Sequence, residues 1–126
     1  MNTYKLDFRV RDYECDLQGI VNNANYQHYL EHARHEYIRT LGISFSDLHD
    51  QGIDFVVARI EMAFKTPLRS KDDFYVTVEM KKEGIRWVFY QNIHRSSDQA
   101  RVVKARVDSV CLIHGKLGNY EFNVEV

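Results

Sequence analysis

The chain has 126 residues, of which 44% are hydrophobic and 13% aromatic, a composition typical of one globular domain with a buried core. Seventeen basic residues oppose eighteen acidic ones, so the net charge of -1 disfavours partners such as nucleic acid or an anionic membrane surface. No apolar run reaches the roughly 18–20 residues that a membrane span needs, and Cys15 and Cys111 lack the spacing of a disulfide framework. We therefore expect a single domain, residues 1–126, in the cytoplasm.

The N-terminal third of the chain changes from a strand pattern to a helix pattern. Apolar residues alternate with charged ones over residues 4–11, which predicts a half-buried strand. From Asn25 to Leu41 the period is helical, and Gly42 follows as a stop signal. This segment predicts a helix of about four to five turns. Its apolar stripe consists of Tyr26, Tyr29, Leu30, Ala33, Tyr37 and Leu41.

The rest of the chain returns to the period of two and predicts no second helix. Five further strands are expected, at residues 56–64, 74–80, 85–93, 100–113 and 120–126, with Gly84 in a hairpin turn. In the first of these, the alternation places Val56, Ala58, Ile60, Met62 and Phe64 on one face. The fold class is therefore α+β, with an antiparallel sheet of about five to six strands packed on one long helix.

The stretch before the helix carries the clearest candidate for chemistry. Asp16 precedes a glycine turn and two good N-cap residues, Asn22 and Asn23, so unpaired backbone N–H groups are expected to cluster just after the acid. Such a helix start can hold the oxygen of a polarised carbonyl, while a carboxylate attacks that carbonyl or activates a water. The alternative is that Asp16 only caps a turn.

Two other patterns suggest different chemistry. The letters "HYLEH" match an inverted zincin motif in which His28 and His32 bind zinc and Glu31 is the base, but no third ligand is recognisable. The alternative is a polar helix face. Cys15 is a candidate nucleophile if a histidine lies near it, although a free cysteine is more often a small buried hydrophobe.

The stretch "YECDLQGIVNNANYQHYLEHAR" resembles the signature of the 4-hydroxybenzoyl-CoA thioesterase family, and the strand–loop–strand of residues 56–80 is similar to that family as well. The resemblance implies a hot-dog fold, in which a curled antiparallel sheet wraps a central helix. It also implies that Asp16 is the catalytic carboxylate and that no metal or cofactor is needed. The signature positions are occupied by Asp16, Gly19, Ile20, Val21, Tyr26, Glu31, Ala33 and Arg34.

The same resemblance assigns further roles around Asp16. The carbonyl-polarising backbone amides fall on Asn23 and Ala24, and Gly19, Asn22, Tyr26 and Glu31 support them. Relatives often carry histidine or an aromatic residue where this chain has Asn22 and Asn23, so the acyl preference of relatives does not transfer directly. Some hot-dog thioesterases take their acid from the helix, which keeps Glu31 as a second candidate.

The resemblance also implies partners. Family members pair sheet to sheet, so a homodimer or homotetramer is expected. The phosphates of CoA call for basic residues, and Arg59, Lys65 and Arg69 are the candidates, although such residues on a strand face are usually just solvated.

The leading functional hypothesis is hydrolysis of an acyl-CoA thioester to free acid and CoA. Three alternatives stay open: a thioesterase for acyl carrier protein, a non-catalytic hot-dog protein that binds an acyl group, and a zinc hydrolase on His28, Glu31 and His32.

Overall fold

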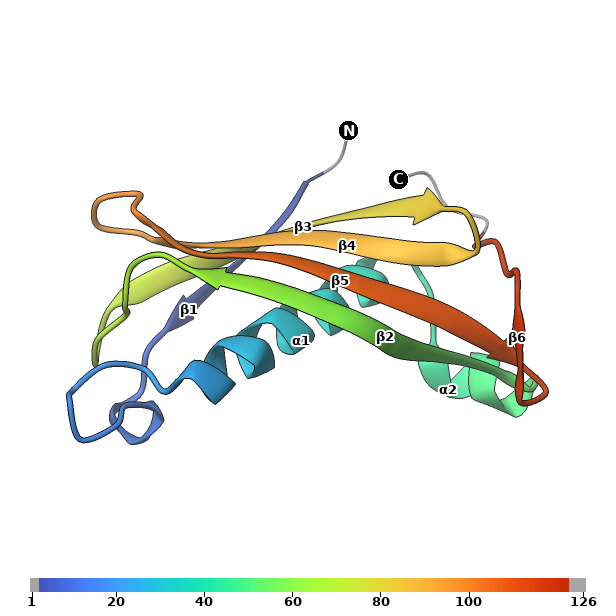
Figure 1. Ribbon diagram of the computed structural model, residues 1–126, viewed down its shortest axis with the longest axis horizontal. Coiled ribbons are helices and arrows are strands. Elements are labelled where there is room, and N and C mark those ends of the chain that lie inside the picture. The colour runs from blue at the N-terminus through green and yellow to red at the C-terminus, as the bar shows by residue number, and fades with distance from the viewer. Residues whose placement is uncertain (1–2, 123–126) are drawn as a thin grey trace.

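In the computed structural model, which describes residues 3–122, a curled antiparallel sheet lies over one long helix (Figure 1). The strand order is β1-β3-β4-β5-β2, and β6 pairs with the end of β5. This is the α+β architecture that the sequence predicts. The elements are β1 (Tyr4–Arg9), α1 (Asn23–Thr40), α2 (Phe45–Asp50), β2 (Ile53–Phe64), β3 (Asp73–Glu83), β4 (Arg86–Arg95), β5 (Arg101–Ile113) and β6 (Lys116–Gly118).

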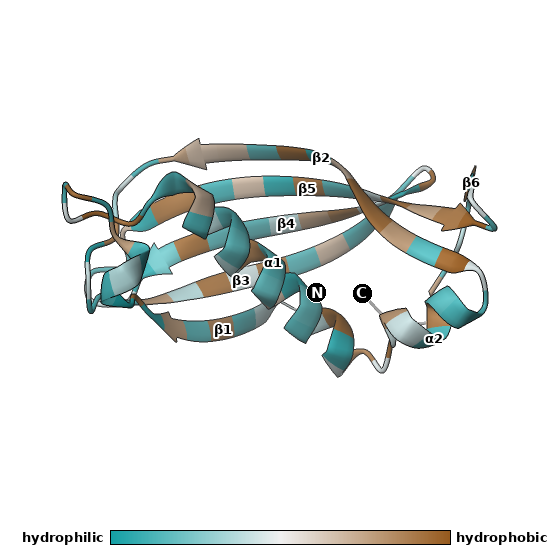
Figure 2. Ribbon diagram, turned by 90° about the horizontal axis from the view of Figure 1, so that it is seen from below, coloured by the Kyte–Doolittle hydropathy of each residue, from teal (hydrophilic) through white to brown (hydrophobic). Residues whose placement is uncertain are grey.

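Helix α1 covers the concave face of the sheet. Seen from below, it runs diagonally across the strands, and α2 lies beneath one end of β2 (Figure 2). The core lies between α1 and the inward side chains of β3 and β4, where Phe74, Val76, Val78 and Ile93 are completely buried. Burial of this many apolar groups is the dominant stabilising contribution. Neither described helix has the length and apolar character required of a membrane-spanning segment.

Helix α1 begins two residues earlier than the predicted start at Asn25. The reason is the cap, because the side chain of Asn22 accepts a hydrogen bond from the Ala24 N–H and starts the helix at Asn23. The predicted apolar stripe is buried except for Leu41, which is half-buried. Arg34 is also buried, which the apolar pattern does not indicate. Its Nη1 donates to Gln91 Oε1 at 3.1 Å, beneath β4.

The prediction of no second helix is wrong. Residues 45–50 form α2, in the polar stretch that follows Gly42, with Ser44 accepting a hydrogen bond from the Asp47 N–H as the N-cap. Six residues are too few to show a helical period in sequence. Phe45 anchors this helix by stacking on Phe55 of β2 at 5.7 Å.

The predicted C-terminal strand is also misplaced. Strand β6 lies at Lys116–Gly118, where the sequence predicts a turn, and Tyr120 and Phe122 lie in no strand. They belong to the core instead, because Trp87 Nε1 donates to the Tyr120 carbonyl at 2.9 Å and Phe122 packs on Trp87 at 5.0 Å. Residues 123–126 of the predicted strand lie outside the described residues.

Strand β2 contains an irregularity that changes which residues share a face. Its register with β5 shifts between Val57 and Arg59, so one extra residue is inserted there. Side chains alternate along a strand, and one insertion therefore moves Val56 away from the face that carries Ile60 and Met62. Val56 is 38% exposed as a result, whereas the sequence predicts it on the same face as those two residues.

Candidate active site

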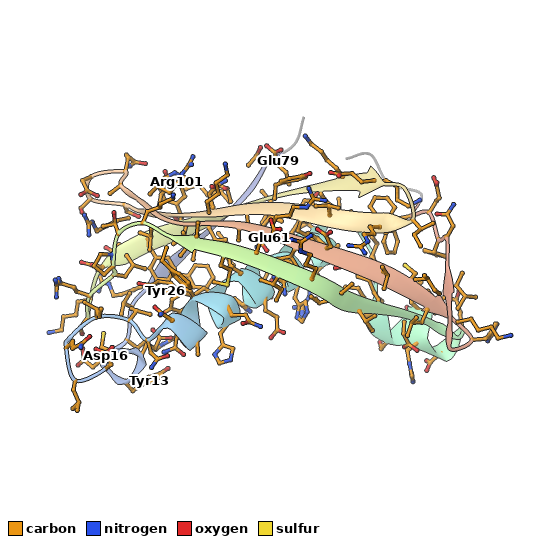
Figure 3. The ribbon with its side chains drawn as sticks, viewed as in Figure 1. Tyr13, Asp16, Tyr26, Glu61, Glu79 and Arg101 are labelled. Atoms are coloured by element: carbon orange, nitrogen blue, oxygen red, sulfur yellow. The ribbon has the colours of Figure 1, made fainter. Side chains whose placement is uncertain are left out.

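Asp16 lies on a tight loop at the end of the sheet where α1 begins (Figure 3). Its backbone closes the loop, because the Asp16 N–H donates to the Ile20 carbonyl at 2.9 Å and the Asp16 carbonyl accepts from the Gly19 N–H at 3.0 Å. Gly19 has a φ of +77°, a backbone conformation that L side chains rarely adopt. The sequence therefore needs glycine here to bring the chain back toward the helix.

The side chain of Asp16 is exposed and partly engaged by its own loop. Oδ1 accepts a hydrogen bond from the Gln18 N–H at 2.9 Å. Oδ2 has no hydrogen-bond partner within residues 3–122. One carboxylate oxygen is thus fixed by the turn, and the other is free to act on a ligand.

The first turn of α1 presents one free amide. Of the two amides predicted for an oxyanion hole, Ala24 N–H donates to the cap oxygen of Asn22 at 3.0 Å. Asn23 N–H has no partner in the described part of the chain, as expected for the first residue of a helix. In this structure Asn23 is therefore the amide available to a polarised carbonyl, and the positive end of the helix dipole lies at the same point.

A pocket of about 260 Å³ opens beside this amide. Tyr26 and Phe64 form much of its apolar surface, with their rings 5.8 Å apart and Phe64 50% exposed. The Tyr26 hydroxyl accepts a hydrogen bond from the Leu68 N–H at 3.0 Å, which ties the helix start to the loop after β2. Burial raises the pKa of the Tyr26 phenol, so this group stays neutral. The pocket is lined by Ile20, Val21, Asn23, Tyr26, Phe64, Lys65, Thr66 and Pro67.

The three basic residues predicted for CoA lie in different surroundings. Lys65 lines the pocket, and Arg69 pairs with Ile20 of the Asp16 loop through an isolated bridge. Arg59 lies further along β2 and forms an ion pair with Glu61 of the same strand. Lys65 and Arg69 are therefore next to the candidate site, whereas Arg59 is paired with an acid of its own strand.

His28, Glu31 and His32 of the zinc motif do not form a metal site together. His28 and His32 are exposed on the side of α1 that faces β1, where both line a groove. Glu31 is exposed and does not line that groove. No group of three or more metal-ligating side chains occurs among residues 3–122. Burial, together with the nearby acids Asp12 and Asp16, raises the pKa of the Cys15 thiol, which opposes a role as nucleophile.

Sequence reasoning missed one acid in this region. Glu14 lies two residues before Asp16 and is only 8% exposed, although an acid in a polar loop is expected to face solvent. The only signal in the sequence is the spacing of acids in "DYECD", which alternation does not distinguish from a solvated loop.

A curled antiparallel sheet around one long helix defines the hot-dog class of proteins. The profile of the thioesterase-like superfamily matches residues 10–120, and the chain belongs to this superfamily.

Two curated relatives are similar along most of the chain. One is the acyl-acyl carrier protein thioesterase ATL3 of Arabidopsis thaliana, which is 31% identical over 86% of this chain and 58% of its own length. The other is the acyl-CoA thioesterase YbgC of Haemophilus influenzae, which is 30% identical over 99% of this chain and 92% of its own length. The chain thus spans about 58% of the Arabidopsis relative.

Among solved structures, the 1,4-dihydroxy-2-naphthoyl-CoA thioesterase Slr0204 from Synechocystis superposes with a TM-score of 0.88. The alignment covers 95% of this chain and 90% of that one at 14% sequence identity, so the likeness concerns the fold.

Proposed function

We propose that the protein hydrolyses the thioester of an acyl-CoA, with Asp16 as nucleophile or general base and the Asn23 amide as oxyanion donor. One observation carries the proposal: a carboxylate with a free oxygen lies on the loop that leads into α1, and the first residue of that helix has a free amide beside an apolar pocket. These two groups would supply the two halves of an acyl-transfer site, and the proposed reaction needs no metal or cofactor. The names of the relatives, several of which are acyl-CoA thioesterases, support the same reaction.

The proposed chemistry balances in two ways. In the first, Asp16 Oδ2 attacks the thioester carbon, the Asn23 N–H stabilises the oxyanion, and the C–S bond breaks to release the CoA thiolate. The thiolate takes a proton, and water then hydrolyses the anhydride on Asp16 to give the free acid. In the second, Asp16 takes a proton from a water that attacks the carbon directly, the C–S bond breaks, and the protonated Asp16 gives its proton to the departing CoA thiolate. Both routes consume one water and give one acid and one thiol.

Finer assignments form part of the same proposal. The sequence of the Asp16 loop favours the 4-hydroxybenzoyl-CoA thioesterase subfamily. Residues 1–126 would act as one thioesterase-like domain. Lys65 and Arg69 would contact the phosphates of the carrier, since both lie beside the pocket. Cys15 and Cys111 are both free, which supports the reducing cytoplasm as the proposed location.

A homodimer or homotetramer is proposed because β2 leaves one long edge of the sheet open. This strand has 12 residues, pairs only with β5 among the described strands, and exposes 38% of Val56 and 46% of Val57. Such an edge is a template for another strand, and a second copy is the proposed occupant. Light scattering coupled to size exclusion measures the mass directly, and a monomer at micromolar concentration would contradict this part.

The carrier is a separate question because one relative acts on an acyl carrier protein. Competition between an acyl-CoA and the same acyl group on the carrier protein decides between the two. A higher kcat/KM for the carrier protein would replace CoA as the proposed substrate.

One observation favours a second candidate function, a protein that binds acyl groups without hydrolysing them. The Asp16 side chain does not line the pocket beside Asn23, and its Oδ1 is engaged by the turn. Tight binding of acyl-CoA without thiol release would support this alternative.

The deciding experiment is a thiol-release assay over aromatic, short and long acyl-CoAs with Asp16→Asn and a control. Asp50→Asn removes an exposed acid from the far end of the molecule, on α2, and is expected to leave turnover unchanged. Asp16→Asn is expected to keep the fold and lose most turnover, by about 100-fold or more. Equal turnover of both variants would remove Asp16 from the mechanism.

A further inference from the structure

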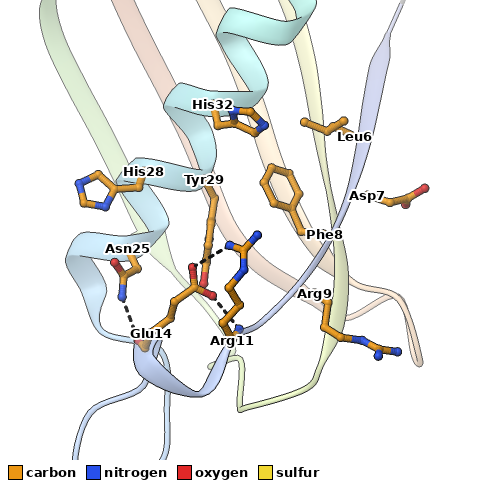
Figure 4. Close-up of a pocket in the computed structure, with 10 residues that line it drawn as sticks. All are labelled: Leu6, Asp7, Phe8, Arg9, Arg11, Glu14, Asn25, His28, Tyr29 and His32. Carbon is orange, nitrogen blue, oxygen red and sulfur yellow. Dashed lines mark hydrogen bonds and ion pairs between the residues drawn. The ribbon is translucent and has the colours of Figure 1, made fainter.

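Glu14 occupies a position that the reaction described above does not use. It ends a short 3₁₀ turn, Asp12–Glu14, and lies between β1 and the Asp16 loop. Its side chain points inward to the groove between β1 and α1 (Figure 4). A buried carboxylate is costly unless other groups satisfy it, so its contacts identify what it does.

The carboxylate of Glu14 binds the residue at the start of its own turn. Arg11 N–H donates to Oε1 at 2.8 Å, and Arg11 Nη1 lies 3.7 Å from Oε2. The groove has a volume of about 500 Å³, and Arg11, His28 and His32 line it together with Glu14. Arg11 is thus already paired with an anion that the chain itself supplies, which favours an internal structural role for Glu14 over a second ligand site.

The backbone of Glu14 connects the same turn to the helix. Its carbonyl accepts two hydrogen bonds, from the Asn22 N–H at 3.0 Å and from Asn25 Nδ2 at 2.9 Å. Asn22 is the cap of α1 and Asn25 lies in its first turn. The residue two positions before Asp16 is therefore attached to the residues on both sides of the Asn23 amide.

Tyr29 of α1 is a third residue next to the Glu14 carboxylate. Its hydroxyl points toward the Glu14 carboxylate and is buried, but it meets no hydrogen-bond partner at standard geometry. Its ring is held by Phe8 at 5.7 Å and by Phe74 at 4.7 Å, so the phenol has little freedom to move away. Burial, followed by the nearby Glu14 carboxylate, raises the pKa of this phenol, which keeps it a neutral O–H donor.

We infer that Glu14 is a positioning residue for Asp16 and the Asn23 amide. Its carboxylate fixes the 3₁₀ turn through Arg11, and its carbonyl attaches that turn to the first turn of α1, so that together they set the distance between the Asp16 carboxylate and the Asn23 amide. The Asp16 side chain makes no hydrogen bond to the helix among the described residues, so its placement depends on the chain segments on either side. The segment after it is closed by the Gly19 turn, and the segment before it is held by Glu14. This inference rests on the proposed role of Asp16.

The primary test is Glu14→Gln, which keeps the volume and the backbone carbonyl but removes the negative charge that pairs with Arg11 and fixes the turn. The thiol-release assay is expected to show kcat lower by roughly 10- to 100-fold with KM changed less than about threefold, because a misplaced catalytic group slows the chemical step more than it weakens binding. The matched control is Glu36→Gln, which removes a pair with Arg39, also at 3.7 Å, within α1 and remote from the Asp16 loop. Unchanged kcat in Glu14→Gln would overturn the inference.

A second variant keeps the test decisive if Glu14→Gln does not fold. Asn25→Ala removes one of the two hydrogen bonds to the Glu14 carbonyl while the side chain of Glu14 remains. It is expected to give the same selective loss in kcat at a smaller magnitude. A higher KM with unchanged kcat in Asn25→Ala would instead indicate a role in substrate binding and would overturn the inference.

A double-mutant cycle separates this inference from the proposed function. If Glu14 acts through Asp16, Glu14→Gln is expected to cause no further loss in the Asp16→Asn background. If Asp16→Asn alone retains full turnover, the proposed function fails first. If Asp16→Asn loses turnover and the effect of Glu14→Gln simply adds to it, the function stands and the positioning role fails.

Discussion

Replacing Tyr26 by phenylalanine tests how firmly the start of α1 is attached to the rest of the protein. The Tyr26 hydroxyl accepts the Leu68 N–H at 3.0 Å, and both residues are at most 3% exposed. Tyr26→Phe keeps the ring against Phe64 and Tyr29 but leaves the buried Leu68 N–H without a partner. An orphaned buried donor costs about 1–3 kcal/mol of the free energy of unfolding.

The size of the protein converts this cost into a shift of the melting temperature. At about 2.1 cal/mol/K per residue, the unfolding entropy of 126 residues is about 0.26 kcal/mol/K near the midpoint. A loss of about 1–3 kcal/mol therefore lowers Tm by about 4–11 °C. Circular dichroism at 222 nm, recorded at matched protein concentration, measures this shift.

The control for this prediction is Tyr37→Phe on the same helix. Tyr37 is 4% exposed, but its hydroxyl makes no hydrogen bond to another described residue. Its loss is expected to change the free energy of unfolding by less than about 0.5 kcal/mol. If both variants melt together, within about 1 °C of the unmodified protein, the hydrogen bond from Leu68 has no net value and the reasoning is refuted.

Two further predictions concern the helix cap and a buried acid. Asn22→Ala removes the acceptor of the Ala24 N–H at 3.0 Å and is expected to lower the free energy of unfolding by about 1 kcal/mol, measured by urea titration; an unchanged urea midpoint would contradict the role of the cap. Hydrogen bonds from Arg106 and Arg86, both at 2.9 Å, hold the pKa of Asp108 below its ordinary value. The stabilisation from Asp108 is therefore fully present above that ordinary pKa and is lost as the pH falls through the lowered one. In urea titrations from pH 7 downward, the unmodified protein should lose stability more steeply below about pH 4 than Asp108→Asn, and parallel curves would exclude the contribution.

The parts of the fold that sequence predicts are those in which one face meets the core over many residues. The helix at Asn23–Thr40 and the strands β1 and β3 turn one regular set of side chains toward the core, so their period is visible in the sequence. The elements that the sequence fails to predict are short or irregular. Helix α2 has six residues, and the inserted residue in β2 reverses the face of Val56, which no local pattern announces.

The candidate site divides in the same way. Asp16, Gly19, Asn22 and Asn23 lie within eight residues, so local rules for turns and caps place a carboxylate and a free amide together. The remaining parts come from elsewhere in the chain. Phe64 and Lys65 reach the pocket from the end of β2, and their arrival depends on the pairing of β2 with β5.

The burial of Glu14 and Arg34 is the least predictable feature of the site region. Both are ionisable residues for which composition and periodicity predict exposure. The Glu14 carboxylate is held by Arg11 of its own turn, whereas Arg34 is buried because a distant residue accepts its hydrogen bond. Gln91 of β4 accepts a hydrogen bond from Arg34 and donates one to the Leu30 carbonyl at 3.0 Å, which satisfies a polar pair within the core. Hydrogen bonds between residues that are far apart in the sequence depend on the whole fold and not on the neighbouring residues.

The exposure of Asp16 connects the proposed chemistry with the proposed assembly. Electrostatic stabilisation of an oxyanion is strong where water is excluded and weak where a site is open to solvent. In the single chain, Asp16 is exposed, the neighbouring Leu17 has 107% relative exposure, and Phe64 at the edge of the pocket is half-exposed. Apolar side chains around an exposed carboxylate fit a surface that something else covers. Because Phe64 ends β2, the open edge strand and the open pocket share this corner of the molecule, and a second copy on that edge would shield the site as well as the strand.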